Sequence, residues 1–346
     1  MKLSNLKTRM NLSDLKSSLP AAPSARVGGL VLGIAAAAAT ALWVRHKASK
    51  AERENPAKGQ FIEVDGVRLH YLDRGEGSPV VLLHGNGMLQ QDFEGSGLVD
   101  LLAARHRVIV FDRPGYGYSE RPRNRLWTAR AQAALLRQAV TALGLETPVV
   151  VGHSWGTIVA TAWALDFPTE VRGLVLLSGY YYPTARPDVP LFSPPAIPII
   201  GDVMRYTVSA LFARAILPGM IKNMFAPRPV SPSFFGTVPR ELLLRPSQIR
   251  ASAAEAALLI PVVASLKKRY HELRLPIRII AGTADRVVFP KSHSIRLHEE
   301  LPHSTLTLVP EVGHMIHFAA GEQIAAAVEE LSPTSPPVKT LRYAIG

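Results

Sequence analysis

The sequence predicts an α/β domain that has a mostly parallel sheet, helices on both faces and an inserted helical cap. Two observations lead to this fold class. Short apolar runs alternate with segments of helical spacing over residues 61–179, and the alternation resumes over residues 274–331. Between these stretches, residues 180–273 are rich in proline and apolar side chains and show no alternation. Short apolar strands joined by helices are typical of a parallel sheet that is covered on both faces.

The composition limits the class of protein. The chain has 346 residues and a hydrophobic share of 47%, so it can bury the core of one large α/β domain. It has no cysteine, which excludes thiol catalysis, disulfides and thiolate metal sites. The net charge is +12, but the basic residues are scattered and form no nucleic-acid-binding motif. We therefore expect a basic surface and no nucleic-acid partner.

The first residues indicate a membrane anchor. Residues 1–26 form a basic leader, and residues 27–45 are uncharged up to Arg45, with Trp43 near the end. This length and the position of the aromatic residue predict a single-pass transmembrane helix. A cleaved signal peptide, giving a secreted or periplasmic protein, or an organelle-targeting peptide are the alternatives. Basic residues flank both ends, so the orientation stays open.

The rest of the chain divides by composition. Residues 46–60 are charged and are interpreted as a linker, and residues 332–346 contain three prolines and predict a flexible tail. The helical cap over residues 180–273 is expected to include a helix at 249–266 that Pro261 interrupts. In the two core parts, strands are predicted at 61–64, 68–72, 79–83, 108–111, 149–151, 174–177, 277–281 and 305–309, and helices at 127–143 and 322–331.

Ser154 is the predicted nucleophile. It stands in a Gly-x-Ser-x-Gly motif, directly after the apolar strand run at 149–151 and before an apolar helical segment. A sharp turn from strand to helix would expose the serine oxygen above the sheet, and the motif glycines would avoid collisions with the neighbouring backbone. A serine needs a base and an oxyanion site to attack a carbonyl group. A helix-capping serine is the alternative interpretation.

Asp285 and His314 are the predicted acid and base. Each follows an apolar strand run, at 277–281 and 305–309 respectively. The chain order of serine, acid and histidine suits an α/β domain in which each residue lies at the carboxyl end of a strand. A turn aspartate and a buried structural histidine are the alternatives.

Two backbone amides are expected to form the oxyanion hole. Trp155 follows the nucleophile at the start of a helix, and Asn86 lies in the glycine-rich loop after an early strand. His84 is expected to shape that loop through hydrogen bonds. A buried ion pair or a turn cap is expected at Asp112 and Arg113.

The remaining histidines do not predict a metal site. His153 precedes the serine and should point to the other side of the strand, and His317 is expected to pack or cap near His314. His293 is one of three histidines expected at the surface around a helix; the others are His298 and His303. No pair has convincing ligand spacing, so neither a metal nor another cofactor is expected.

Taken together, these motifs resemble the α/β-hydrolase superfamily over about residues 61–331. Within it, the chain is similar to the capped group that contains epoxide hydrolases, haloalkane dehalogenases, haloperoxidases, iminopeptidases and esterases. The resemblance implies an eight-stranded, mostly parallel sheet and a mobile cap. Epoxide hydrolases and dehalogenases use an aspartate at the elbow, where this chain has Ser154, which argues against both chemistries.

A serine hydrolase that cleaves a carboxylic ester or a related acyl bond is therefore the leading hypothesis. Acyl transfer or perhydrolysis on the same residues, an iminopeptidase, and a membrane-tethered, non-catalytic binding protein are the alternatives. The substrate would be a small acyl compound. Apolar cap side chains are expected to line its pocket, namely Phe192, Phe212, Met224 and Phe225.

Overall fold

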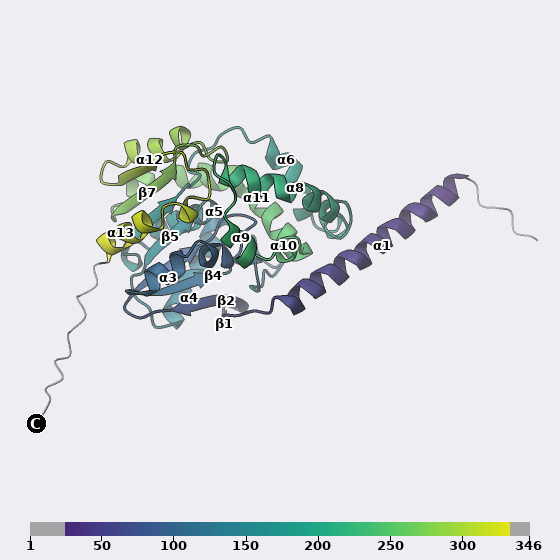
Figure 1. Cartoon of the computed structure of the whole chain (residues 1–346), viewed down its shortest axis with the longest axis horizontal. Coiled ribbons are helices and arrows are strands. Elements are labelled where there is room, and N and C mark those ends of the chain that lie inside the picture. The colour runs from purple at the N-terminus through teal and green to yellow at the C-terminus, as the bar shows by residue number, and fades with distance from the viewer. Residues whose placement is uncertain (1–24, 333–346) are drawn as a thin grey trace, which may run out of the picture. The chain divides into compact units, whose positions relative to one another are not determined.

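The computed structural model describes residues 25–332, and the chain divides into two compact units, residues 1–43 and 44–346. The second unit contains an eight-stranded sheet in the order β1-β2-β4-β3-β5-β6-β7-β8 (Figure 1). Strand β2 is antiparallel to β1 and β4, and the pairs from β4 to β8 are parallel, which confirms the predicted fold class. The strands are β1 (Gln60–Val64), β2 (Val67–Arg74), β3 (Ser78–Leu83), β4 (His106–Phe111), β5 (Val149–His153), β6 (Gly173–Leu177), β7 (Ile277–Gly282) and β8 (Thr305–Val309).

Helices cover both faces of the sheet because its central strands are apolar on both faces. In β3, Val81 and Leu83 belong to the core cluster that includes α4 and α5, whereas Val80 and Leu82 belong to the cluster that includes α3 and α13. Successive strand residues point to opposite faces, so an unbroken apolar run must be buried by helices on both faces of the sheet. The helices of the core are α2 (Gln91–Gly95), α3 (Leu98–Ala103), α4 (Ala129–Ala142), α5 (Trp155–Asp166), α12 (Ser294–Glu300) and α13 (Gly321–Leu331), with 3-10 turns η1 (Pro168–Glu170), η4 (Pro290–Ser292) and η5 (Ile316–Phe318).

The chain between β6 and β7 is helical and lies to one side of the sheet (Figure 1). The longest helix, α11, continues through Pro261, so the predicted interruption is wrong. A proline removes one hydrogen bond from a helix. Here the burial of Val262, Val263 and Leu266 in the core stabilises the turn that lacks this bond. The elements of this region are α6 (Asp188–Phe192), η2 (Pro194–Ala196), α7 (Ile200–Met204), α8 (Val208–Phe225), α9 (Pro232–Thr237), α10 (Arg240–Leu243), α11 (Pro246–Lys267) and η3 (Tyr270–Glu272).

Helix α1 (Ala25–Glu54) extends well beyond the predicted anchor. The structure thus corrects the predicted linker, since residues 46–54 are helical and β1 begins at Gln60. The charged residues of this stretch are strong helix formers, and Lys50 pairs with Glu54 one turn later. Ala51 is buried, and Glu52 contacts Arg245 of the cap, so this part of the helix is packed.

Within the described residues, two helices are long and apolar enough to cross a membrane. One covers residues 26–54, and its most apolar stretch is almost entirely exposed; the other is the partly buried α11. A signal sequence and a core helix of a soluble protein satisfy the same criteria. Most of the predicted leader and all but the first residue of the predicted tail lie outside the described residues.

The N-cap of α4 allows a test of the local structure. Thr128 accepts a hydrogen bond from the Ala131 amide, so Thr128→Ala should lower the free energy of unfolding by about 1 kcal/mol in a urea titration. Thr141→Ala is the matched control, because Thr141 lies in the same helix but bonds only to the Arg137 carbonyl. Equal losses in the two variants would contradict a capping role for Thr128.

Candidate active site

Ser154 lies at the sharp turn between β5 and α5. Its φ is +52°, a conformation that is uncommon for residues other than glycine and marks local strain. A Cβ atom at Gly152 would lie 2.7 Å from the backbone of Gly156, and one at Gly156 would collide with the Leu83 carbonyl. The two glycines therefore allow the turn to form, and Ser154 is partly exposed above the sheet.

His314 and Asp285 meet at the carboxyl ends of β8 and β7. The Nδ1 atom of His314 lies 2.8 Å from Oδ2 of Asp285, and both side chains are buried. The other carboxylate oxygen of Asp285 accepts hydrogen bonds from the amides of Val287 and Val288. These bonds fix the carboxylate, so it can select one tautomer and one orientation of the imidazole.

The loop after β3 lies against the serine. A Cβ atom at Gly85 would be 3.1 Å from the Ser154 Cβ, which places the backbone of this loop beside the turn. Trp155 is the first residue of α5, so its amide is among those that the helix leaves unpaired. The side chain of Asn86 bonds to Ser252 of α11, donating to the carbonyl at 3.0 Å and accepting from the hydroxyl. Of the two predicted oxyanion residues, Trp155 thus follows the serine in the chain, and Asn86 follows Gly85, whose backbone lies beside the turn.

His84 shapes this loop, as the sequence predicts. Its Nδ1 lies 2.8 Å from the Gly85 carbonyl, and its Nε2 accepts the Arg113 amide at 3.0 Å. Burial and the neighbouring Arg113 charge lower the pKa of His84 to about 4. The ring is therefore neutral at physiological pH and carries its proton on Nδ1.

Arg113 holds the same loop through hydrogen bonds to its carbonyl groups. Its Nε donates to the His84 carbonyl at 2.7 Å, and Nη2 donates to the Gly85 carbonyl at 3.1 Å. The guanidinium also forms a bidentate pair with Glu255 of α11, and all of these side chains are fully buried. Burial alone would raise the pKa of Glu255, but the charge and hydrogen bonds of Arg113 hold it below its ordinary value.

Sequence reasoning missed the partner of this arginine. The sequence predicts a buried ion pair or a turn cap at Asp112 and Arg113 but no partner for the arginine, because Glu255 lies far along the chain, inside an apolar helical segment. The available signal was that isolated charge, because an acid within an apolar helix is rarely buried without a partner. Asp112 has a separate partner, since its Oδ2 lies 2.7 Å from His70 Nδ1.

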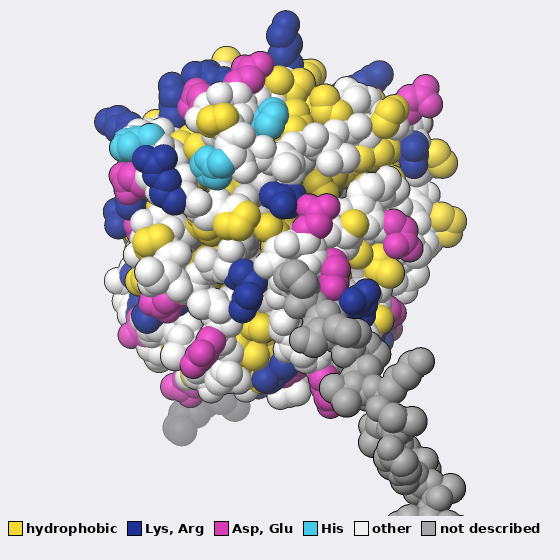
Figure 2. Space-filling model, turned by 90° about the vertical axis from the view of Figure 1, so that its left-hand side faces the viewer, with side chains coloured by type: hydrophobic (Ala, Val, Ile, Leu, Met, Phe, Trp, Pro, Cys, Tyr) yellow, Lys and Arg dark blue, Asp and Glu magenta, His cyan; other side chains and the backbone are white. Residues whose placement is uncertain are grey.

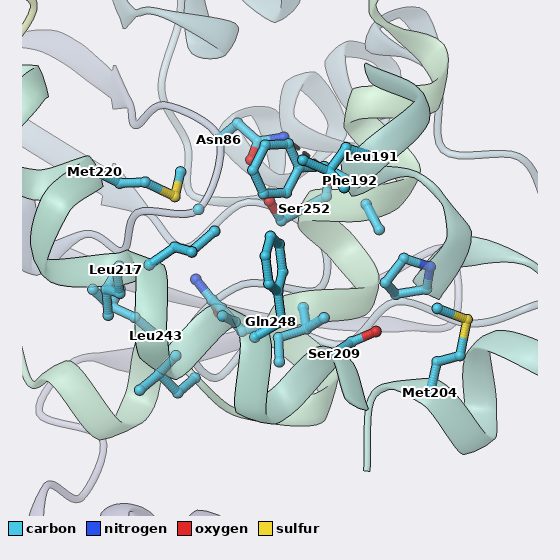
Figure 3. A pocket seen from close by; sticks show the side chains of 18 of the residues that line it. Asn86, Leu191, Phe192, Met204, Ser209, Leu217, Met220, Leu243, Gln248 and Ser252 are labelled. Atoms are coloured by element: carbon cyan, nitrogen blue, oxygen red, sulfur yellow. Dashed lines mark hydrogen bonds between the residues drawn. The ribbon is translucent and has the colours of Figure 1, made fainter. Parts of the chain in front are cut away.

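An apolar cavity of about 430 Å³ lies between the cap and the loop that follows β3. Figure 3 shows Asn86 and Ser252 at its polar part, with Leu217 and Met220 of α8 among the apolar lining. The predicted pocket residues Phe192, Phe212 and Met224 also line it.

The fourth predicted pocket residue, Phe225, does not line the cavity. It is buried and packs its ring against Phe234 and Phe318, with centroids 5.4 and 5.1 Å away. Phe225 directly follows Met224 in α8, so its side chain points from a different face of the helix. Apolar composition alone does not predict which face lines the cavity.

One group of side chains in the described residues could hold a metal ion. Ligand atoms of Asp92, His153 and His317 lie within 4.8 Å of one another, and all three residues are buried. His317 Nε2 lies 3.2 Å from Asp92 Oδ2, so these two groups already form a pair. His153 Nε2 lies 3.0 Å from the His314 carbonyl, so its ring supports the loop of the predicted base. The spacing along the chain gave no sign of this group.

His293 is buried, so its predicted position at the surface is wrong. Its ring stacks on Tyr180 with centroids 4.3 Å apart, and Nδ1 accepts hydrogen bonds from the amides of Tyr181 and Tyr182. Burial and the nearby Arg186 charge lower its pKa to about 4. The position before α12 suggested exposure, but the chain after β6 folds over it.

The family is shown by a family model for the alpha/beta hydrolase fold, which matches residues 78–320, most of the chain. The chain therefore belongs to the alpha/beta hydrolase fold family, and its relatives support an enzyme of the hydrolase type. Haloalkane dehalogenase 2 of Mycobacterium tuberculosis is 27% identical over 289 residues, covering 80% of this chain and 95% of that protein.

Two solved structures are similar in fold. A thermophilic esterase from Thermogutta terrifontis has a TM-score of 0.62 at 22% identity, covering 79% of this chain and 97% of its own. A membrane phospholipase A, described as a bacterial virulence factor, has a TM-score of 0.61 at 20% identity, covering 88% and 96%. At these identities the likeness concerns the fold, and it does not identify a substrate.

The buried ion pair gives a stability prediction. Glu255→Gln leaves the Arg113 charge buried without its counter-ion, so the free energy of unfolding should fall by about 3–5 kcal/mol in a denaturant titration. Glu330→Gln is the control, since Glu330 forms an exposed pair with Arg278 and should cost less than about 1 kcal/mol. Similar losses in both variants would contradict the special position of Glu255.

The two buried histidines give a pH prediction. Because the pKa values of His84 and His293 are about 4 in the folded protein and 6.5 ordinarily, the unfolded chain binds more protons between these values. Stability should therefore fall as the pH is lowered from 6.5 to about 4, by about 3 kcal/mol for His84 alone. Thermal unfolding across this range measures the effect.

The matched variants for this pH series are His293→Phe and His303→Gln. The first should lose part of the pH dependence, and the second should keep it, because His303 is exposed. A melting temperature that stays constant between pH 6.5 and 4 would contradict the prediction.

Proposed function

We propose that this protein is a serine hydrolase that cleaves a carboxylic ester through an acyl-enzyme on Ser154. Two observations support this best: the 2.8 Å contact between His314 and Asp285, and the position of Ser154 on a strained strand-to-helix turn. A histidine oriented by a buried carboxylate is the base that a serine nucleophile requires. A serine at the elbow is also the reason for proposing ester hydrolysis over dehalogenation.

In the first step, Ser154 Oγ attacks the ester carbonyl carbon while His314 takes the serine proton. The carbonyl electrons move to its oxygen, where the amides of Trp155 and Asn86 stabilise the negative charge. When the tetrahedral intermediate collapses, the bond to the alkoxy group breaks. His314 gives the proton to the departing alcohol, and the acyl group stays on Ser154.

In the second step, water replaces the alcohol. His314 removes a proton from the water, whose oxygen attacks the acyl carbon in the same oxyanion site. The bond to Ser154 Oγ then breaks, the serine recovers its proton from His314, and the carboxylic acid leaves. Asp285 keeps the imidazole oriented throughout and stabilises the imidazolium that forms twice in the cycle.

The N-terminal helix would attach this enzyme to a membrane. Residues 27–45 carry no charge before Arg45 and belong to a helix that is long and apolar enough to span a bilayer. We therefore propose a single-pass anchor, and the small acyl substrate would be hydrolysed by the domain that follows it.

A fluorophosphonate reagent tests the nucleophile. Wild-type protein in detergent should gain one adduct by intact mass, and Ser154→Ala should gain none, because no activated oxygen remains. The same substitution should lower hydrolysis of a short p-nitrophenyl ester by about 10⁴-fold or more. Ser233→Ala, an exposed serine of the cap, is the matched control and should react like the wild type. Full labelling of the Ser154→Ala protein would exclude Ser154 as the nucleophile.

A further inference from the structure

The first part of the cap exposes an unusual amount of apolar surface. Nine large apolar side chains from α6 to α8 are 42–78% exposed. Helix α7 contacts both η2 and α8, and the Phe192 and Phe212 rings lie 6.1 Å apart, so these elements adjoin. We call this set the apolar rim, and its members are Leu191, Ile197, Ile199, Ile200, Val203, Val208, Leu211, Phe212 and Met220.

Helix α8 is apolar on both of its sides. Phe212, Ile216 and Met220 line the cavity, whereas Leu211 and Ala215 are exposed and do not. A cap helix in water normally carries polar residues on its outer face. Arg214 and Lys222 are the only charged residues in this eighteen-residue helix.

One exposed side chain of the apolar rim lies on a strained backbone. Ile199 has a φ of +66°, which is a strained conformation for a β-branched residue, and its side chain is 78% exposed. The acidic residues of this region, Asp188 and Asp202, are both paired with arginines. The apolar rim therefore presents no unpaired acid among its own elements. By contrast, basic and acidic side chains intersperse over the face in Figure 2.

The apolar rim is continuous with the cavity. Leu191, Val208, Phe212 and Met220 are exposed members of the rim and also line the cavity. Apolar side chains therefore continue from the exposed rim into the cavity, whose lining also includes Asn86. The volume of about 430 Å³ lies in the range of small-molecule sites.

The chain itself indicates which apolar phase covers the rim. The candidate membrane span ends in the helix whose residues 44–54 already belong to the catalytic unit. Since the catalytic unit follows the span directly along the chain, insertion of the span would tether this unit to a bilayer. Large exposed apolar patches mark protein or membrane contacts. In this chain the candidate span favours a membrane contact.

We propose that the apolar rim docks on the lipid bilayer and that the substrate is a long-chain acyl ester lipid that enters the cavity directly from it. This inference rests on the proposed ester hydrolysis and on the proposed anchor. The acyl chain would occupy the apolar cavity, and its ester group would lie at the oxyanion loop beside Ser154.

The absence of cysteine makes the docking directly measurable. Ile199→Cys in the full chain can be labelled with an environment-sensitive fluorophore and placed in vesicles of phosphatidylcholine and phosphatidylglycerol. Spin-labelled lipid should quench this label. Leu126→Cys is the matched control, because Leu126 is 67% exposed but outside the cap, and its label should stay unquenched.

Two outcomes of this measurement would overturn the docking. One is equal quenching at the two positions, or none at either. The other is a label at Ile199 that is shielded from water but not quenched by lipid, which would indicate that a second copy of the chain covers the rim.

The substrate is tested with a variant that leaves the cavity lining intact. Replacing Ile199, Val203 and Leu211 together by serine removes rim side chains that do not line the cavity. Hydrolysis of vesicle phospholipid should fall by about tenfold or more, since apolar burial at the bilayer is lost. Hydrolysis of a soluble short-chain ester should stay within about twofold of the wild type.

The controls separate this inference from the proposed function. Wild-type hydrolysis of the short ester without hydrolysis of vesicle lipid would overturn the lipid substrate and leave the serine hydrolase intact. An equal loss of both activities in the triple variant would also overturn it. Loss of neither would show that the rim does not deliver the substrate. A wild-type protein that hydrolyses neither ester and resists the fluorophosphonate would overturn both proposals.

Discussion

The buried pair of Arg113 and Glu255 is the interaction on which the site depends. A charge in the interior is tolerated only when its partner and remaining hydrogen bonds are satisfied, and this guanidinium meets that requirement with Glu255, Gln132 and two carbonyls. Those carbonyls belong to His84 and Gly85, so the guanidinium holds the loop beside Ser154 through hydrogen bonds. Glu255 provides the counter-charge that allows this guanidinium to be buried. Glu255 comes from the cap helix α11, and the cap thereby helps to form the site.

The parts predicted from sequence are those encoded by local patterns. The apolar run of β5 and the glycines around Ser154 define a strand, a turn and a helix within a few residues. Asp285 and His314 could be predicted to lie close together because parallel strands end at one edge of the sheet. Local propensity also explains why the linker prediction for residues 46–60 is wrong in its first part, since the charged residues at the end of α1 favour a helix.

What could not be predicted depends on distant pairing. Glu255, Ser252 and Asp92 each act on a partner far along the chain, and a single sequence does not indicate which buried acid meets which base. The cap posed a similar difficulty. Its helices are apolar on more than one side, so composition suggested Phe225 for the pocket as readily as Met224, and only the packing distinguishes them.

The backbone bond between the cap and His314 has a consequence for how such enzymes can be altered. The His314 amide donates to the Met224 carbonyl at 2.9 Å, and Met224 lies in the last turn of α8, the helix that lines the cavity. A graft of another cap onto this scaffold would therefore exchange the support of the histidine along with the pocket. Exchanging the cap would therefore change substrate selectivity and turnover at the same time.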